Sequence, residues 1–230
     1  MQGKLPRPDI AAIVDTGREK TATWEYVEQI HRPALASVGV ELHIVSHDYA
    51  TVDLMTAGGK VLMPMYTTHS GNLSKLPTYC SDKWKKRPLM RWLREQGVTK
   101  GRQWLGISID EADRMKPSGV QWLENAFPLI DLGLSRDDCY SLVRQMGWPD
   151  PPKSSCLMCP HMGDAQWRHM KATHPQDFEA AVQVERELQR SDPTLFLHRS
   201  AKPLDLVPWD EQPTLFDEDT LTCQASGCWT

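Results

Sequence analysis

The sequence predicts an α/β protein with a mostly parallel open sheet and flanking helices, and two observations lead to this prediction. Residues 10–45 have the pattern of a strand, a helix and a second strand, which is typical of a parallel βαβ unit. The 230 residues are 40% hydrophobic and 24% charged, with 14 Gly and 17 Pro. This composition fits a globular protein with one sizeable core and excludes collagen-like and wholly disordered chains.

The βαβ unit begins with an apolar run at residues 10–14, which predicts a buried strand that ends in the turn Asp15-Thr16-Gly17. A helix with a kink at Pro33 follows, because apolar residues recur there at helical spacing. The apolar face of this helix is formed by Trp24, Val27, Ile30 and Leu35. Alternating apolar residues at 40–45 then predict the second strand, parallel to the first.

Two further strands and two further helices are expected along the rest of the chain. Residues 104–109 predict a strand closed by Asp110, and residues 127–130 predict a shorter one. Ser135 to Gly147 has the marks of a capped helix, with Ser135 as N-cap and Asp138 three residues later. A long helix is predicted from Asp177 to Arg190.

The net charge of −4 conceals an uneven distribution. After Lys202 the chain has six acidic residues and no Lys or Arg, so residues 1–202 hold 26 basic and 24 acidic side chains. We therefore expect one main domain at residues 1–204 and an acidic, Pro-containing tail at 205–230. This charge distribution excludes a uniformly basic nucleic-acid binder but is compatible with an anionic ligand.

The start of the chain, Met1 to Pro8, is polar and lacks the apolar stretch of a signal peptide. The longest apolar runs are shorter than the roughly 20 residues of a membrane helix. We therefore expect a cytoplasmic protein without a membrane segment. In a reducing compartment, paired cysteines indicate metal or redox sites before disulfides.

The six cysteines comprise two single residues and two closely spaced pairs. Cys139 lies on the apolar face of the 135–147 helix, which predicts a packed thiol. The other five are Cys80, the pair Cys156 and Cys159, and the terminal pair Cys223 and Cys228. Two intervening residues let Cys156 and Cys159 reach one metal from a single turn, although a redox dithiol has the same spacing and two unligated thiols are a third alternative. Cys80 is the best candidate for a third ligand, and His161 is a weaker one.

A basic segment with two interleaved tryptophans follows Cys80. Its six basic residues are Lys83, Lys85, Lys86, Arg87, Arg91 and Arg94, and its tryptophans are Trp84 and Trp92. Such a surface suits phosphate or sulfate groups beside a stacked ring, and a solvated helix face is the alternative. The turn Asp15-Thr16-Gly17 and Asp110 end two strands at what would be one sheet edge, where open α/β sheets bind ligands. The alternative is that each of these two segments is an ordinary turn between a strand and a helix.

Together these stretches resemble the phosphoadenosine phosphosulfate reductase family, within the adenine nucleotide alpha hydrolase-like superfamily, in a subgroup common among phage and bacterial genes. The stretches that carry the resemblance are residues 12–19, 80–89, 106–111, 152–160 and 196–200. The resemblance implies adenine-nucleotide chemistry coupled to sulfur, with ATP or a sulfonucleotide as substrate. It implies that members reduce activated sulfate or insert sulfur into a nucleic acid, such as tRNA or DNA.

When the functional residues of the family are matched to this sequence one by one, the resemblance implies a [4Fe–4S] cluster held by Cys80, Cys156 and Cys159. It places Asp15, Thr16 and Gly17 beside the nucleotide. The anionic ligand is expected at Lys85, Arg87 and Arg91, with Asp110 at the same crevice. Cys223 or Cys228 would carry or resolve a sulfur intermediate, with a thiol reductant such as thioredoxin as partner.

This sequence departs from the family pattern at three places. The Glu-Cys-Gly-Leu-His pattern of sulfate-reducing members is absent around Cys223 and Cys228, so this pair is a thiol shuttle, completes a metal site with Cys156 and Cys159, or is idle. Ser81 stands where a second tandem cysteine is usual, so a three-cysteine cluster is expected.

The phosphate-binding loop Ser-Gly-Gly-x-Asp-Ser does not precede Asp15. Either the chain begins late relative to its relatives, or a partner supplies the loop, or nucleotide binding has been lost. The exposed sheet edge left by a missing first strand favours a homodimer. An alternative function follows from these departures and the terminal cysteines, namely a zinc-stabilised, catalytically inactive module that binds nucleic acid or a protein.

Overall fold

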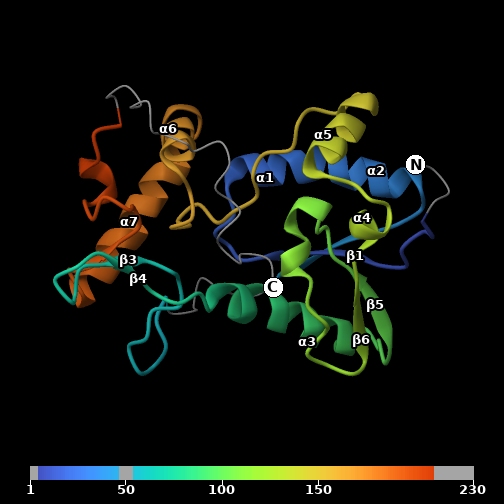
Figure 1. Cartoon of the computed structure of the whole chain (residues 1–230), viewed down its shortest axis with the longest axis horizontal. Coiled ribbons are helices and arrows are strands. Elements are labelled where there is room, and N and C mark those ends of the chain that lie inside the picture. Colours follow the sequence, from blue (N-terminus) through green and yellow to red (C-terminus); the bar gives the residue numbers. More distant parts are fainter. Residues whose placement is uncertain (1–4, 47–53, 210–230) are drawn as a thin grey trace. The chain divides into compact units, whose positions relative to one another are not determined.

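The computed structural model describes residues 5–46 and 54–209, and its contacts divide the chain into two compact units (Figure 1). Of the described residues, unit 1 comprises 5–13, 26–45 and 89–152. Unit 2 comprises 14–25, 46, 54–88 and 153–209. Both units contain helices and short strands, so the predicted α/β class is confirmed. The cysteines Cys223 and Cys228 and most of the predicted tail lie outside the described residues.

The predicted strand, helix and strand at the start of the chain are present. Strand β1 (Ala11–Asp15) pairs with β2 (Leu42–Ser46), and a helical segment connects them. This segment consists of α1 (Thr21–Tyr26), a π-helical turn (Val27–His31) and α2 (Arg32–Ser37). The π turn lies just before Pro33, which has no N–H and whose ring crowds the preceding turn, so the kink expected at Pro33 takes this wider form.

The two later strands are not where the sequence pattern predicted them. Strand β5 (Gly101–Trp104) pairs in parallel with β6 (Leu123–Ala126), and Trp104 lies opposite Ala126. The predictions of strands at 104–109 and 127–130 were therefore wrong. The apolar run after Trp104 leaves the sheet and enters a 3₁₀ helix (Ile109–Arg114), and Pro128 opens the short helix α4 (Pro128–Asp131). Proline favours a first helical turn and cannot donate to a sheet, which explains the second error.

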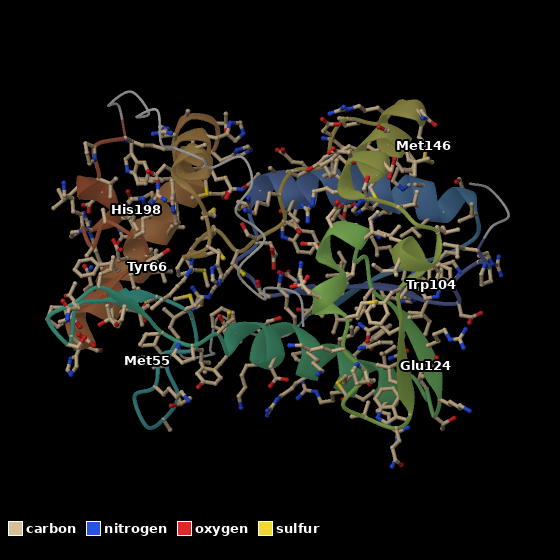
Figure 2. The ribbon with its side chains drawn as sticks, viewed as in Figure 1. Met55, Tyr66, Trp104, Glu124, Met146 and His198 are labelled. Atoms are coloured by element: carbon tan, nitrogen blue, oxygen red, sulfur yellow. The ribbon has the colours of Figure 1, made fainter. Side chains whose placement is uncertain are left out.

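Helix α5 (Arg136–Gln145) confirms the predicted capped helix. Ser135 accepts the backbone N–H of Asp138 at 3.1 Å, and the Asp138 carboxylate accepts the N–H of Ser135 at 2.9 Å. Gly147 has a φ of 73°, a left-handed conformation that glycine adopts without strain. Cys139 is partly buried on this helix and Met146 is exposed, so the predicted apolar face is only partly covered (Figure 2).

The basic segment after Cys80 is helical. A π-helical turn (Asp82–Lys86) continues directly into α3 (Arg87–Glu95). Trp84 is buried in the π turn, with 4% of its surface exposed, so this tryptophan is a core residue and is not displayed to a ligand.

Unit 2 contains a small antiparallel sheet that the sequence pattern did not predict. Strand β3 (Tyr66–Thr67) lies between β4 (Ser74–Lys75) and β7 (Leu195–Phe196) and is antiparallel to both. Among the described residues, three short sheets thus take the place of the single open sheet that was expected. Strands of two residues leave almost no alternating pattern, so sequence periodicity had no signal to detect.

A pair of helices forms the main core of unit 2, and Figure 1 shows the two packed next to each other. They are α6 (Asp164–Thr173) and α7 (Pro175–Ser191), and the second confirms the predicted helix over 177–190. The fully or almost fully buried side chains of this core include Trp167, Met158, Leu188, Leu197 and Leu204. Trp167, Phe178 and Trp209 pack with their ring centroids 6.1–6.4 Å apart.

Glu185 on α7 is a fully buried carboxylate that fixes the chain after β7. Its Oε1 accepts the backbone N–H of Leu197 at 2.7 Å, and its Oε2 accepts that of Leu204 at 2.5 Å, in the 3₁₀ turn Leu204–Leu206. Burial raises the pKa of Glu185, while these two hydrogen bonds act in the opposite direction. One carboxylate therefore closes the loop formed by residues 197–204.

No helix within the described part of the chain is both long enough and apolar enough to cross a membrane.

Replacing Glu185 with Ala should lower the free energy of unfolding by about 2–6 kcal/mol, because two buried N–H groups lose their acceptor at about 1–3 kcal/mol each. Urea unfolding of the full chain measures this change. Glu187→Ala, an exposed carboxylate two residues later, is the control and should stay within about 0.5 kcal/mol of the parent chain. Equal losses for the two variants would show that Glu185 does not hold the loop.

Candidate functional site

The candidate site lies wholly within unit 2 and starts at the turn after β1. Gly17 has a φ of 65°, and its N–H donates to Asp15 Oδ1 at 2.7 Å. Thr16 is fully buried, and its hydroxyl accepts the N–H of Arg18 at 3.3 Å. The predicted turn is therefore present, with Asp15 shaping the backbone and Thr16 pointing into the protein.

Glu19 is the centre of a buried polar cluster, with 3% of its side chain exposed. Its Oε1 lies 2.9 Å from Lys85 Nζ and 3.2 Å from the hydroxyl of Thr16, which donates to it. The Cys156 thiol also points to this oxygen, with Sγ at 3.8 Å. A carboxylate this deeply buried needs a counter-charge and hydrogen bonds, and this one has both.

Cys156 reaches Glu19 because the two residues form an isolated antiparallel β-bridge. Next to it, the N–H of Leu157 donates to the carbonyl of Arg18 at 2.8 Å. The Cys-x2-Cys turn then closes with the N–H of Cys159 donating to the carbonyl of Cys156 at 3.1 Å. The predicted tight turn is thus present, and its first cysteine is anchored to the segment after β1.

Cys80 enters the site from the start of the basic helix. Its backbone N–H donates to the carbonyl of Leu62 at 2.9 Å, and Lys85 on the following π turn supplies the ammonium to Glu19. Cys80, Cys139, Cys156 and Cys159 carry thiols and form no disulfide.

Electrostatics link the three cysteines predicted as metal ligands. Burial and the charge of Cys159 together raise the pKa of Cys80 to about 11. Burial, helped by Glu19 and Cys159 and opposed by Lys85, raises the pKa of Cys156 to about 12. Cys159 therefore acts electrostatically on both of the other thiols.

Two lysines interact electrostatically with these thiols. Burial lowers the pKa of Lys85, but its interactions with Cys156 and Glu19 outweigh burial, so the net shift is upward. Burial also lowers the pKa of Lys20 and outweighs the opposing effect of Cys159, so the net shift of Lys20 is downward. Lys20 had no role in the sequence analysis, since nothing in the pattern distinguishes it from other surface lysines.

The donor chemistry of this site fits a thiolate-bound metal or cluster, with cations that offset the added negative charge. The side chains are not gathered as they would be around a bound ion. Among the described residues, no group of three or more His, Cys, Asp or Glu side chains is arranged to hold a metal. The thiols would therefore have to lose their protons and turn toward a common centre on binding.

His161, the weaker ligand candidate, already has a cation as neighbour. Its Nδ1 lies 2.7 Å from Lys75 Nζ, and its Nε2 is buried without a hydrogen-bond partner. Burial lowers the pKa of His161 to about 4, and the charges of Lys75 and Lys153 contribute to this. An ammonium that donates to Nδ1 leaves the ring proton on Nε2, so in this arrangement neither ring nitrogen offers a free lone pair to a metal.

The remaining residues of the predicted anion site already have partners. Arg87 pairs with Asp82 at 2.6 Å, and Arg91 lies 3.8 Å from Glu95, with both pairs exposed. Arg91 belongs to unit 1 and not to unit 2. These contacts match the alternative of a solvated helix face, and an anion would have to displace the carboxylates.

Asp110, the other predicted crevice residue, also lies in unit 1. Its Oδ2 accepts the N–H of Arg136 at 2.6 Å and the hydroxyl of Ser108 at 3.2 Å, so it caps the start of α5. The adjacent Glu111 is the buried acid, and it pairs with Arg114 at 2.6 Å and Arg136 at 2.9 Å. Sequence reasoning singled out Asp110 because it closes an expected strand, and that strand is absent.

No family model, curated protein or solved structure matches this chain.

Replacing Glu19 with Gln should lower the free energy of unfolding by about 1–3 kcal/mol, because the Lys85 ammonium loses its counter-charge. The loss is not larger, because 31% of the Lys85 side chain is exposed to water. Urea unfolding measures the loss, and Glu25→Gln is a control at a more exposed carboxylate of the same unit. The double variant Glu19→Gln with Lys85→Met should recover part of the loss, since no unpaired charge is left. Additive losses in the double variant would contradict a coupled pair.

Proposed function

We propose that this chain resembles phosphoadenosine phosphosulfate reductases in function and performs sulfur transfer or sulfonucleotide reduction. One observation carries the proposal: the Cys156 thiol lies at the buried Glu19–Lys85 ion pair and 3.9 Å from the hydroxyl of Thr16, in the Asp15–Gly17 turn. Cys159 lies in the same tight turn as Cys156, and Cys80 lies five residues before Lys85. Once a metal has replaced the thiol protons, Lys85 and Lys20 would offset the charge that remains.

In this proposal Cys80, Cys156 and Cys159 hold a [4Fe–4S] cluster. The cluster would either supply electrons or bind sulfur at one of its iron atoms. Lys85 and Lys20 offset the charge of the thiolates. Glu19 holds Lys85 in place and lies within reach of the Cys156 proton, at 3.8 Å from its sulfur. Zinc is the alternative metal, since it takes the same thiolate ligands.

The ligand of the proposed site is an adenine nucleotide, either ATP or a sulfonucleotide. The Asp15-Thr16-Gly17 turn would lie beside the nucleotide. Lys85 and Arg87 would meet the anionic groups of the nucleotide after Arg87 exchanges its carboxylate partner. The sulfur acceptor is a small molecule or a nucleic acid such as tRNA or DNA. Within the proposal, Cys223 and Cys228 act as the thiol pair, and a reductant such as thioredoxin regenerates them in the cytoplasm.

Anaerobic purification followed by metal and sulfide analysis tests this proposal. The protein should contain iron and inorganic sulfide in equal amounts and absorb visible light as iron–sulfur proteins do. A colourless protein that contains zinc and no iron would contradict the cluster. That result would favour the alternative, a zinc-stabilised binding module for nucleic acid or a protein partner.

Single cysteine variants test the ligand assignment. Cys156→Ser should abolish the visible absorbance, because it removes a thiolate at the centre of the site. Cys139→Ser should retain it, because Cys139 lies on α5 in unit 1 and is the matched control. The absorbance spectrum of each purified variant, with circular dichroism as a check of folding, provides the measurement. Equal effects of the two substitutions would refute the assignment.

A further inference from the structure

Outside the cysteine site, three side chains of unit 2 form a hydrogen-bonded chain that ends at an exposed hydroxyl. His198 Nε2 lies 2.9 Å from Asp164 Oδ1, and His198 Nδ1 lies 2.8 Å from Ser200 Oγ. Asp164 is the first residue of α6, and His198 and Ser200 lie in the loop closed by Glu185; Figure 2 labels the histidine. The imidazole is buried, whereas Ser200 faces solvent.

The hydrogen bonds between Asp164, His198 and Ser200 define which atom donates a proton and which atom accepts it. Burial raises the pKa of Asp164, but its contacts with His198 and Arg199 outweigh burial and lower it, so the carboxylate is ionised. An ionised carboxylate only accepts, which leaves the imidazole proton on Nε2. The backbone N–H of Ser200 donates to Nδ1 at 3.2 Å, so Nδ1 bears the lone pair. The hydroxyl of Ser200 therefore donates to Nδ1.

The imidazole is held in one position. Its ring packs edge-on against Trp209 with the centroids 5.1 Å apart and an interplanar angle of 72°. Glu185 fixes the two ends of its loop through the N–H groups of Leu197 and Leu204. A base that already points at the hydroxyl in the free protein loses no further conformational entropy when a substrate binds.

The surroundings of Ser200 indicate the charge of its reaction partner. Arg199 and Lys202 flank the serine in sequence, and both are exposed. The Nη2 atom of Arg199 lies 3.2 Å from Oδ2 of Asp164. The Arg199 guanidinium therefore binds the same carboxylate that orients His198. Two cations beside a nucleophilic hydroxyl favour a leaving group that departs as an anion.

We propose that Asp164, His198 and Ser200 form a second reactive site, in which the Ser200 hydroxyl is a nucleophile toward small activated esters with an anionic leaving group. The roles match those of serine, histidine and aspartate in hydrolases, with His198 Nδ1 as the base and Nε2 bound to the carboxylate. This site does not depend on the proposed function of the cysteines.

In the first step, Ser200 Oγ attacks the carbonyl carbon of the ester, and its proton passes to His198 Nδ1. The bond between that carbon and the leaving-group oxygen breaks, its electron pair stays on the oxygen, and the proton on Nδ1 is released to solvent. Water then attacks the acyl group on Ser200, transfers a proton through Nδ1 to the serine oxygen, and releases the carboxylic acid. Neither step involves oxidation or reduction.

An alkyl fluorophosphonate tests this site, because it reacts with activated serines with loss of fluoride and does not depend on the protein's thiols. The full chain should be labelled on the peptide that contains Ser200, as located by mass spectrometry. His198→Gln should slow labelling by about 100-fold or more, which is the usual contribution of a general base. Ser200→Ala should abolish labelling while the thermal unfolding curve stays unchanged, since the side chain is exposed.

Ser37 is the matched control. It is an exposed serine whose hydroxyl donates to the carbonyl of Ala34 at 2.7 Å and contacts no imidazole. It should remain unlabelled, and Ser37→Ala should not change the labelling of Ser200. Cys156→Ser should also leave this labelling unchanged, which separates the second site from the proposed metal function. Labelling of Ser200 that is no faster than that of Ser37 would overturn the proposal.

Discussion

A carboxylate that is removed from water must find a counter-charge, and the candidate site depends on this constraint at Glu19. Lys85 supplies the charge at 2.9 Å, while the Thr16 hydroxyl and the Cys156 thiol point at the same oxygen. These partners come from the segment after β1, the basic helix and the Cys-x2-Cys turn. Leaving the carboxylate unpaired would cost several kcal/mol, so the ion pair draws the three segments to one place.

The same constraint determines the chemistry available to the thiols. Burial beside Glu19 keeps Cys156 protonated, with a pKa of about 12, and Cys80 follows with a pKa of about 11. Thiols of this kind react slowly on their own, because the thiolate is the reactive form. They become ligands when a metal replaces their protons, and the ammonium groups of Lys85 and Lys20 offset the charge that remains.

Sequence reasoning located the features of the fold and of this site that depend on local chemistry. It placed the Asp15-Thr16-Gly17 turn and the capped α5 helix, because caps and turns are determined by neighbouring residues. It missed the role of Glu19, since only tertiary packing distinguishes a buried acid from an exposed one. It also misplaced the strand near Trp104, because a short apolar run looks the same inside a strand and just beyond it.

X-ray absorption at the iron and zinc edges of the anaerobically purified chain is the decisive measurement for the cysteine site, since it reports the atoms bound to the metal. We expect iron with sulfur neighbours and a second shell of iron, and loss of this signal in a Cys80→Ser variant. Zinc with sulfur neighbours and no iron signal would contradict the cluster. Metal bound by nitrogen and oxygen alone would show that the three cysteines are not its ligands.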